Sequence, residues 1–373
     1  MKPNAYKNRL TALRRRMAST AADGWDAAWI LQPENRRYLS GFKAEDGHYP
    51  ESSGSLLISN SRALLITDSR YTLQAQNEAI DFEIKTLRQN LADSMPAWVQ
   101  EMGIQTLGFE QDYLVWSLHR KLHERLKGLS PPVGLTPLNG VVEEMREVKE
   151  PEEIRSLEAA ADLISMVMDE MARRLTPGMT EREVAWEIEG LIREGGAEGL
   201  SFPPIVASGP NSALPHAVPT DRPIQADEPV ILDLGARVQG YCSDMTRTIF
   251  TGDPPPWLKT IYRTVRQAQL AALKEVRPMV ESAYLDARAR DLIQEAGFGD
   301  CFGHGLGHGV GLAVHERPRL GPGNSVQLKE GTVFTIEPGI YMPGKGGVRL
   351  EEMVLIEATG PRLLTRNKLF YDV

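Results

Sequence analysis

The sequence predicts a mixed α/β (α+β) fold with two domains, the second built from two similar halves. A chain of 373 residues is long for a single hydrophobic core, which favours a division into domains. Residues 24–140 alternate apolar strand-like runs with helical stretches, and the sequence then becomes strongly charged. Two later segments have the pattern of β-hairpins and carry acidic residues in similar places. We therefore expect domains at residues 1–145 and 146–373.

The first domain is expected to contain a β-sheet covered by helices. Four apolar runs have the length and composition of buried strands: AAWILQ, GSLLIS, RALLIT and TLGFE. A helix is expected where Leu118, Leu122 and Leu126 recur every fourth residue, because this spacing places all three on one face. Strands that alternate with helices in this way are typical of an α/β sheet.

The second domain is expected to begin with two helices. Pro151 suits the first position of a helix, and the glutamates beside it favour the positive end of the helix dipole. Thr180 and Glu183 have the spacing of a capping box, which predicts a second helix that ends near Gly195 and Gly196. A second helical pair follows further along the chain.

Each half then ends in a predicted hairpin with two acidic residues. The hairpins comprise residues 230–250 and 332–357 and carry Asp233 with Asp244 and Glu337 with Glu351. Asp233 lies inside VILDL and Glu337 follows VFTI, where an unpaired charge would be costly. Glu352 adjoins Glu351, and since strand neighbours face opposite ways, spacing alone does not decide which points inward. A separation of about one hundred residues between the hairpins suggests an internal duplication.

A glycine-rich segment supplies two histidines. Residues 302–311 have glycine at every odd position, with His304 and His308 between glycines. Each glycine would cost a helix roughly 0.8–1 kcal/mol relative to alanine, so an extended conformation is expected. At about 3.3 Å per residue, the histidines would lie roughly 13 Å apart, too far to bind the same ion. One of them is a candidate metal ligand and the other a candidate substrate contact.

Convergence of the four acids with one histidine would require bound cations. Ionised carboxylates in one buried site repel each other, and protonating them would leave buried polar groups without partners. Two divalent ions would supply four positive charges. Carboxylate oxygens with a single imidazole suit Mn²⁺, Co²⁺ or Zn²⁺. The residues therefore predict a hydrolase with two metal ions.

Composition narrows the class of protein further. A net charge of -8 and a pI near 5.5 argue against nucleic acid as the main partner. The sequence has no run of about eighteen apolar residues, so we expect no membrane-spanning helix. Two cysteines, Cys242 and Cys301, are too few for a disulfide framework, which favours the reducing cytoplasm.

Six strings in the second domain point to one family: DLG (233–235), CSDMTRT (242–248), GHGLGHGVGL (303–312), VHERP (314–318), TIEPGIY (335–341) and GVRLEE (347–352). They resemble the pita-bread metallopeptidases, in the Xaa-Pro aminopeptidase and Xaa-Pro dipeptidase (prolidase) branch. In the first domain, NRRYLSGF and LLITDSRYTLQAQNE resemble the creatinase-like N-terminal domain of that branch. The resemblance thus extends over nearly the whole chain and implies a pita-bread fold for the second domain.

The resemblance also implies roles for individual residues. The implied metal ligands are Asp233, Asp244, His308, Glu337 and Glu351, with Glu337 acting in catalysis as well. His216, His304 and His315 are similar to the family's substrate-side histidines, and Arg349 to an arginine beside a bridging glutamate. Two divalent ions are implied, Mn²⁺ first, with Co²⁺ or Zn²⁺ as alternatives. A homodimer is implied by the family alone.

The function implied is metal-dependent hydrolysis of the bond before proline at the N-terminus of a di- or oligopeptide. Arg319, four residues after His315, resembles an arginine of some prolidases that would bind the free proline carboxylate. An ordinary surface charge explains Arg319 equally well. Two alternatives to a peptidase are a non-catalytic binding member of the fold and a creatinase-type amidinohydrolase.

Overall fold

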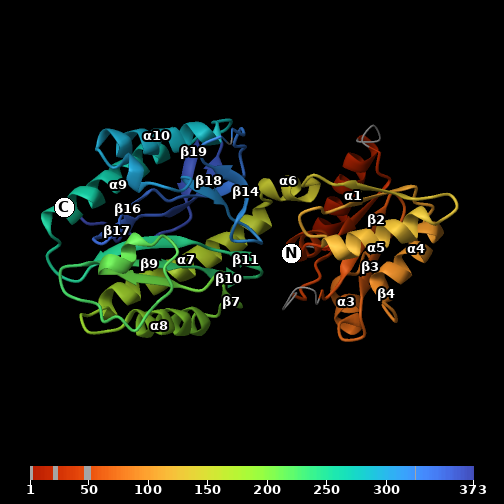
Figure 1. Ribbon diagram of the computed structural model, residues 1–373, viewed down its shortest axis with the longest axis horizontal. Helices are drawn as coiled ribbons and strands as arrows, with labels where there is room; N and C mark the ends of the chain where they lie inside the picture. The colour runs from red at the N-terminus through yellow and green to blue at the C-terminus, as the bar shows by residue number, and fades with distance from the viewer. Residues whose placement is uncertain (1–2, 20–23, 46–51, 324) are drawn as a thin grey trace. The chain divides into compact units, whose positions relative to one another are not determined.

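The computed structural model describes residues 3–19, 24–45, 52–323 and 325–373. The chain forms two compact units, Met1–Met145 and Arg146–Val373 (Figure 1). None of the described helices combines the length and apolar character needed to cross a membrane.

The first unit contains a mixed sheet with helices along its connections. Its strand order is β4-β3-β2-β1-β5-β6, with antiparallel pairing of β1 to β2 and β2 to β3 and parallel pairing elsewhere. The strands are β1 (Ala27–Ile30), β2 (Ser55–Ser59), β3 (Ala63–Thr67), β4 (Glu83–Thr86), β5 (Thr106–Phe109) and β6 (Gly134–Pro137). The helices are α1 (Pro3–Ser19), α2 (Pro33–Ser40), α3 (Thr72–Glu78), α4 (Leu91–Glu101), α5 (Trp116–Lys127) and α6 (Val141–Glu147).

Burial explains which of these elements were predicted. Strands β1, β2 and β3 are buried along their whole length, so their sequences are continuous apolar runs. Helix α5 buries Leu122 and Leu126, which confirms the predicted helical face. Strands β4 and β6 were not predicted, because they lie at the sheet edges, are partly exposed and have no apolar run.

The second unit begins with the predicted helices. Helix α7 (Pro151–Arg174) starts at Pro151, and helix α8 (Glu181–Glu194) starts after Thr180. The capping box of Thr180 with Glu183 is confirmed. A second pair, α9 (Pro256–Glu275) and α10 (Ser282–Glu295), follows about one hundred residues later, as a duplication predicts.

The strands of this unit repeat one arrangement. In the first half, β9 (Pro229–Leu234) pairs with β12 (Met245–Phe250), and β10 (Ala236–Val238) pairs with β11 (Tyr241–Cys242). In the second half, β15 (Val333–Ile336) pairs with β18 (Glu352–Glu357), and β16 (Gly339–Met342) pairs with β17 (Gly346–Arg349). The other strands are β7 (Gly199–Leu200), β8 (Ile205–Ser208), β13 (Gly307–Gly309), β14 (Glu316–Leu320) and β19 (Gly360–Leu363), and short helices η1 (Gly209–Ala213) and η2 (Gly299–Cys301) precede β9 and β13.

Both hairpins are interrupted, whereas the sequence predicted continuous strands. Pro338 follows β15 and has no N–H to donate to a ladder, so the first strand of the second hairpin breaks there. Gly235 lies at the equivalent break after β9. A Cβ at this position would lie 2.2 Å from the carbonyl oxygen of Ser243, so only glycine allows the two strands to approach this closely.

The two helix pairs cover opposite sides of the strands in this unit (Figure 1). Helices α7 and α8 pack on β8, β9 and β12 around Ile164, Val184 and Leu232. Helices α9 and α10 pack on β15, β17 and β18 around Val265 and Phe334. Side chains at the strand interruptions therefore lie between two hydrophobic layers.

Candidate metal centre

The strand interruptions carry the four acidic residues of the predicted site. Asp233 is the last residue but one of β9, and Asp244 lies between β11 and β12. Glu337 directly follows β15, and Glu351 directly precedes β18. Because the two halves have the same arrangement, each contributes one acid from either side of its hairpin.

These acids converge with histidine at distances suited to metal ions. Three groups have ligand atoms that all lie within 4.8 Å of one another: Asp233 with Asp244 and Glu351, His308 with Glu337 and Glu351, and Asp244 with His308 and His315. The Nε2 atom of His308 is 3.2 Å from Oε1 of Glu337 and 3.6 Å from Oδ2 of Asp244. The first two groups share Glu351, so one carboxylate lies between two sets of donors.

Electrostatics in the cluster favour a bound cation. Burial, followed by repulsion from the other acids, raises the pKa of both Asp244 and Glu351 well above the ordinary value. Burial also raises the pKa of Asp233, although Arg349 opposes this shift. Burial has the same tendency at Glu337, but hydrogen bonding from His308 and its positive charge outweigh it and lower that pKa. The ionised cluster therefore lacks sufficient positive charge of its own.

The donor atoms fit divalent metal ions. Oδ1 of Asp233 and Oε1 of Glu351 are buried and have no hydrogen-bond donor among the described residues. Nδ1 of His308 is 3.1 Å from the carbonyl oxygen of Gly309, an acceptor, so a bound ion could replace the Nε2 proton that faces Glu337 while the ring proton on Nδ1 stays in place. Unpaired carboxylate oxygens and an oriented imidazole are the donors expected around Mn²⁺, Co²⁺ or Zn²⁺.

Arg349 holds the edge of the cluster in place. Its guanidinium donates to Oδ2 of Asp233 at 2.7 Å, to Oγ1 of Thr246 at 3.0 Å and to the Tyr341 hydroxyl at 2.9 Å. Thr246 in turn donates to Oε2 of Glu351 at 2.8 Å. Arg349 therefore positions a candidate ligand from each half of the unit.

The neighbouring acid, Glu352, faces away from the cluster. Arg247 donates to its Oε1 atom at 2.9 Å, and the Thr365 hydroxyl donates to its other oxygen. Strand alternation at the start of β18 thus brings Glu351 to the site and leaves Glu352 paired within the core.

Comparison with known proteins agrees with this geometry. Residues 155–358 match metallopeptidase family M24, and residues 9–148 match the Creatinase/Prolidase N-terminal domain. The chain belongs to family M24.

Relatives of this M24 metallopeptidase resemble it along nearly their whole length. An uncharacterized peptidase of Bacillus subtilis is 39% identical over 92% of this chain and 94% of its own. The structure of an Xaa-Pro dipeptidase from Bacillus anthracis has a TM-score of 0.89 and 38% identity, covering 96% of this chain and 98% of that one. An X-Pro aminopeptidase from Thermotoga maritima has a TM-score of 0.81 and 37% identity, covering 94% and 97%. The predicted family and two-part fold are confirmed, and a member of this family uses divalent ions.

The three remaining histidines of the M24 site have different surroundings. His304 lies with Nε2 3.0 Å from the Tyr341 hydroxyl and Nδ1 2.7 Å from the carbonyl oxygen of Gly305. His315 packs edge-on against His308, with ring centroids 4.2 Å apart. Burial lowers the pKa of both His304 and His315, and the negative charge of Glu337 opposes this shift in each. His315 therefore lies at ligand distance from Asp244 and His308, and His304 contacts Tyr341 beside Arg349. His216 is exposed in the loop next to Pro215, whose carbonyl oxygen accepts from Arg349.

Arg319 lies on the same side as His308. The two residues are opposite each other in the β13–β14 pairing, so their side chains project from the same face of the sheet. Arg319 is exposed and makes no ion pair within the described part of the chain. The geometry leaves its guanidinium available to a ligand.

Sequence reasoning missed Tyr341 and Thr246. Tyr341 is buried, contacts both Arg349 and His304, and has a pKa raised to about 12, first by burial. Thr246 links Arg349 to Glu351. A signal for Thr246 existed, because it is two residues after Asp244 and alternation places both on one face of the strand.

Proposed function

We propose that this M24 peptidase hydrolyses the peptide bond preceding proline at the N-terminus of a dipeptide or short peptide, using two divalent ions. The observation that carries the proposal is the buried cluster of four acids and His308, whose overlapping groups offer two sets of donors. The names of the relatives, an Xaa-Pro dipeptidase and an X-Pro aminopeptidase, support the choice of substrate.

In this proposal Asp233, Asp244, His308, Glu337 and Glu351 would hold the ions, and Asp244 and Glu351 each belong to two of the groups of donor atoms. Divalent ions at this position would polarise the scissile carbonyl and lower the pKa of an attacking water. Glu337 would accept the proton of that water and pass it to the leaving nitrogen. Its lowered pKa keeps the carboxylate ionised, so that both oxygens can act as acceptors.

We propose a different role for each of the three remaining histidines. His315 is exposed beside the cluster, and its lowered pKa keeps one ring N–H available as a neutral donor to a substrate carbonyl. His304 has both ring nitrogens engaged by Gly305 and Tyr341, so we assign it the orientation of Tyr341. His216 would contact the substrate from the loop that precedes β9.

The chemistry of the bond before proline is compatible with this site. The bond before proline is a tertiary amide without an N–H, so a peptidase that must bind that hydrogen cannot use it. Polarisation of the carbonyl needs no such donor. Arg319 would then pair with the free carboxylate of a dipeptide, and longer peptides would lack this contact.

The alternatives have less support. A non-catalytic member of the fold would be expected to lose ligands, whereas every predicted ligand residue lies at the cluster. A creatinase-type amidinohydrolase would not need metal ions, which leaves four buried acids unexplained. We further propose Mn²⁺ as the preferred ion, a homodimer as the assembly, and a cytoplasmic location, which suits two free cysteines.

Metal removal and reconstitution test the proposal. The protein would be stripped with a chelator, restored with Mn²⁺, Co²⁺ or Zn²⁺ singly, and assayed with Ala-Pro, Ala-Pro-Ala and a Met-initiated peptide without proline. We expect loss of hydrolysis after stripping and recovery on the proline substrates alone. Activity that survives complete chelation would contradict a metal-dependent reaction, and equal cleavage of the Met-initiated peptide would contradict proline specificity.

A further inference from the structure

A buried carboxylate outside the metal centre gathers an unusual number of hydrogen bonds. Glu181, in the first turn of α8, is fully buried. Its Oε1 atom accepts from the backbone N–H and hydroxyl of Ser208 at 2.7 and 2.8 Å, and its Oε2 atom accepts from the N–H and hydroxyl of Thr220 at 3.0 and 2.6 Å. The amide of Asn211 is 3.1 Å from both oxygens.

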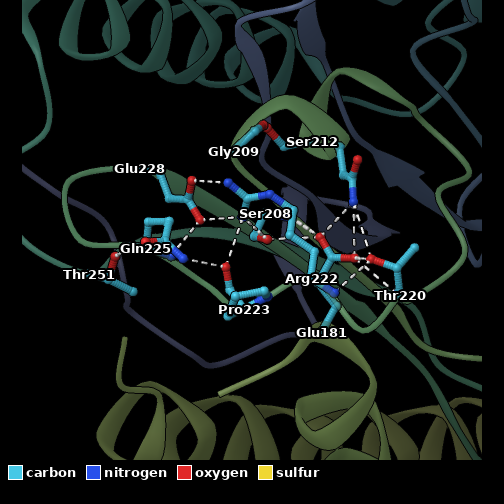
Figure 2. A network of polar contacts seen from close by, with 11 residues as sticks. Glu181, Ser208, Gly209, Ser212, Thr220, Arg222, Pro223, Gln225, Glu228 and Thr251 are labelled. Carbon is cyan, nitrogen blue, oxygen red and sulfur yellow. Dashed lines mark hydrogen bonds and ion pairs between the residues drawn. The ribbon is translucent and has the colours of Figure 1, made fainter. Parts of the chain in front are cut away.

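These contacts close the base of a loop. Asn211 and Thr220 are nine residues apart in the chain and bind the same carboxylate, so Glu181 joins the two ends of segment 211–220. Ser208, at the end of β8, fixes this base to the strand that pairs with β9. Arg222 adds a second connection, because it donates to the Ser208 hydroxyl at 2.6 Å (Figure 2).

The tip of the same loop reaches the metal centre. The carbonyl oxygen of Pro215 accepts from Arg349 at 3.1 Å, and the buried Ala217 packs in a cluster with Tyr341. Between them lies His216, which is exposed and is a proposed substrate contact. Glu181 therefore fixes the base of the loop, Arg349 and Tyr341 meet its tip, and His216 lies between these two fixed regions.

A neutral side chain of the same size cannot replace Glu181 in this role. A carboxylate offers two acceptor oxygens with about four lone-pair sites, whereas glutamine would place an NH₂ group against one set of donors. The facing N–H of Thr220 or of Ser208 would then meet another donor. One end of the loop would be released while the helix itself kept its capping box of Thr180 and Glu183.

We infer that Glu181 is a positioning residue, which sets the location of His216 in the substrate site by closing the loop 211–220. This inference rests on the proposed peptidase function for its kinetic consequence. Its structural consequence, a loop whose order depends on one carboxylate, can be measured in the absence of any substrate.

The test compares Glu181→Gln with Glu183→Gln, a matched control two residues along the same helix. We expect Glu181→Gln to speed hydrogen exchange at the backbone amides of residues 211–220 and to reduce kcat/KM on Ala-Pro about 10- to 100-fold, as loss of one or two charge-assisted hydrogen bonds predicts. Manganese stoichiometry, measured on the same sample, should be unchanged. Glu183→Gln should alter neither the exchange of the loop nor the activity.

A double-mutant cycle separates positioning from general destabilisation. If Glu181 acts through His216, adding Glu181→Gln to His216→Ala should cost no further activity, whereas independent effects would multiply. Multiplying effects, or unchanged exchange in the loop, would overturn the inference. If Glu181→Gln does not fold, Thr220→Val removes one hydroxyl donor and faces the same criteria. If the wild-type protein fails to cleave Ala-Pro, the proposed function fails, and the exchange measurement still decides whether Glu181 orders the loop.

Discussion

Two buried acidic regions of the second unit are neutralised in different ways. Glu316, at the start of β14, is buried between Arg146 and Lys149, and the Lys149 ammonium lies 2.9 Å from its Oε1 atom. At the metal centre, the pairing partners of the four carboxylates within the described residues are Arg349 and His308. Glu316 thus has two cations of the chain, whereas four acids share one arginine and one imidazole.

The pKa values reflect this difference. Burial tends to raise the pKa of Glu316, but the charges of Lys149 and Arg146 outweigh it and the pKa is lowered. At Asp244 and Glu351 burial and mutual repulsion act together, and the pKa of each is raised. Cations of the chain neutralise the buried Glu316, whereas the acids of the cluster need ions from solution to be neutralised.

The largest expected effect is at the cluster. Asp244→Asn should reduce kcat/KM at saturating Mn²⁺ by roughly 1,000-fold or more, equivalent to about 4 kcal/mol, because it removes a proposed ligand that belongs to two donor groups. The same change should raise the thermal midpoint of the metal-free protein, because one source of repulsion is gone. Thermal unfolding with and without Mn²⁺ would show whether the variant is stabilised only when the metal is absent. Asp221→Asn, at an exposed acid, should change neither, and a metal-free Asp244→Asn protein less stable than wild type would contradict the repulsion.

The second largest effect is a loss of stability on substitution of Glu316. Glu316→Gln should lower the free energy of unfolding by about 3–5 kcal/mol, because the buried Arg146 and Lys149 would face a neutral amide. Urea denaturation would measure the loss. A matched control is Glu170→Gln, which breaks the exposed pair with Arg173 and should cost at most about 1 kcal/mol. Equal losses for the two variants would show that burial does not distinguish these pairs.

The sequence predicted the acids that converge in the cluster better than their surroundings. Acids inside apolar runs are locally visible, so the sequence alone could single out Asp233, which is buried, and Glu337, which is partly buried. The partners of Glu352 and Glu316 could not be identified in this way, since Arg247, Arg146 and Lys149 are brought to them by packing between distant segments. Spacing left Glu351 and Glu352 undecided for the same reason.

The elements show a similar limit. Caps and apolar faces depend on neighbours in sequence, and helices α7 and α8 were accordingly predicted with their starts. Edge strands β4 and β6 depend on a partner strand, and their own residues give little signal. The hairpin breaks at Gly235 and Pro338 likewise depend on how closely two strands approach.

A third buried acid, Glu110, has only uncharged hydrogen-bond donors and so extends the comparison. It accepts from the backbone N–H groups of Leu31 and Gln32 at 2.5 and 2.6 Å and from the Asn35 amide at 2.6 Å, and Glu143 shares that amide. Burial raises its pKa from 4.5 to about 7 despite these hydrogen bonds, with Glu143 adding to the shift. Neutral donors therefore compensate for burial less well than the two cations beside Glu316.

The raised pKa of Glu110 determines how the free energy of unfolding changes with pH. Because the pKa of Glu110 is higher in the folded protein, its contribution to stability is fully present below about pH 4.5 and is lost as the pH rises towards 7, by on the order of 3 kcal/mol. Glu110→Gln cannot lose a proton and should lack this component. The difference in unfolding free energy between wild type and variant, compared at pH 5 and pH 7.5, gives the contribution of Glu110. Parallel pH profiles for the two proteins would contradict the raised pKa.

The smallest effect is expected at Arg319, which forms no ion pair with the acids of the described residues. Arg319 lies opposite His308 on the adjacent strand, yet it is exposed and unpaired within the described residues, so its charge is available to a substrate carboxylate. Arg319→Ala should reduce kcat/KM on Ala-Pro about 10- to 100-fold and leave Ala-Pro-Ala nearly unchanged, because the longer peptide has its carboxylate elsewhere. Arg317→Ala, two residues earlier on β14, serves as the control for loss of positive charge. Equal losses on both peptides would remove Arg319 from substrate recognition, and equal losses for both variants would attribute the effect to the general field of the strand.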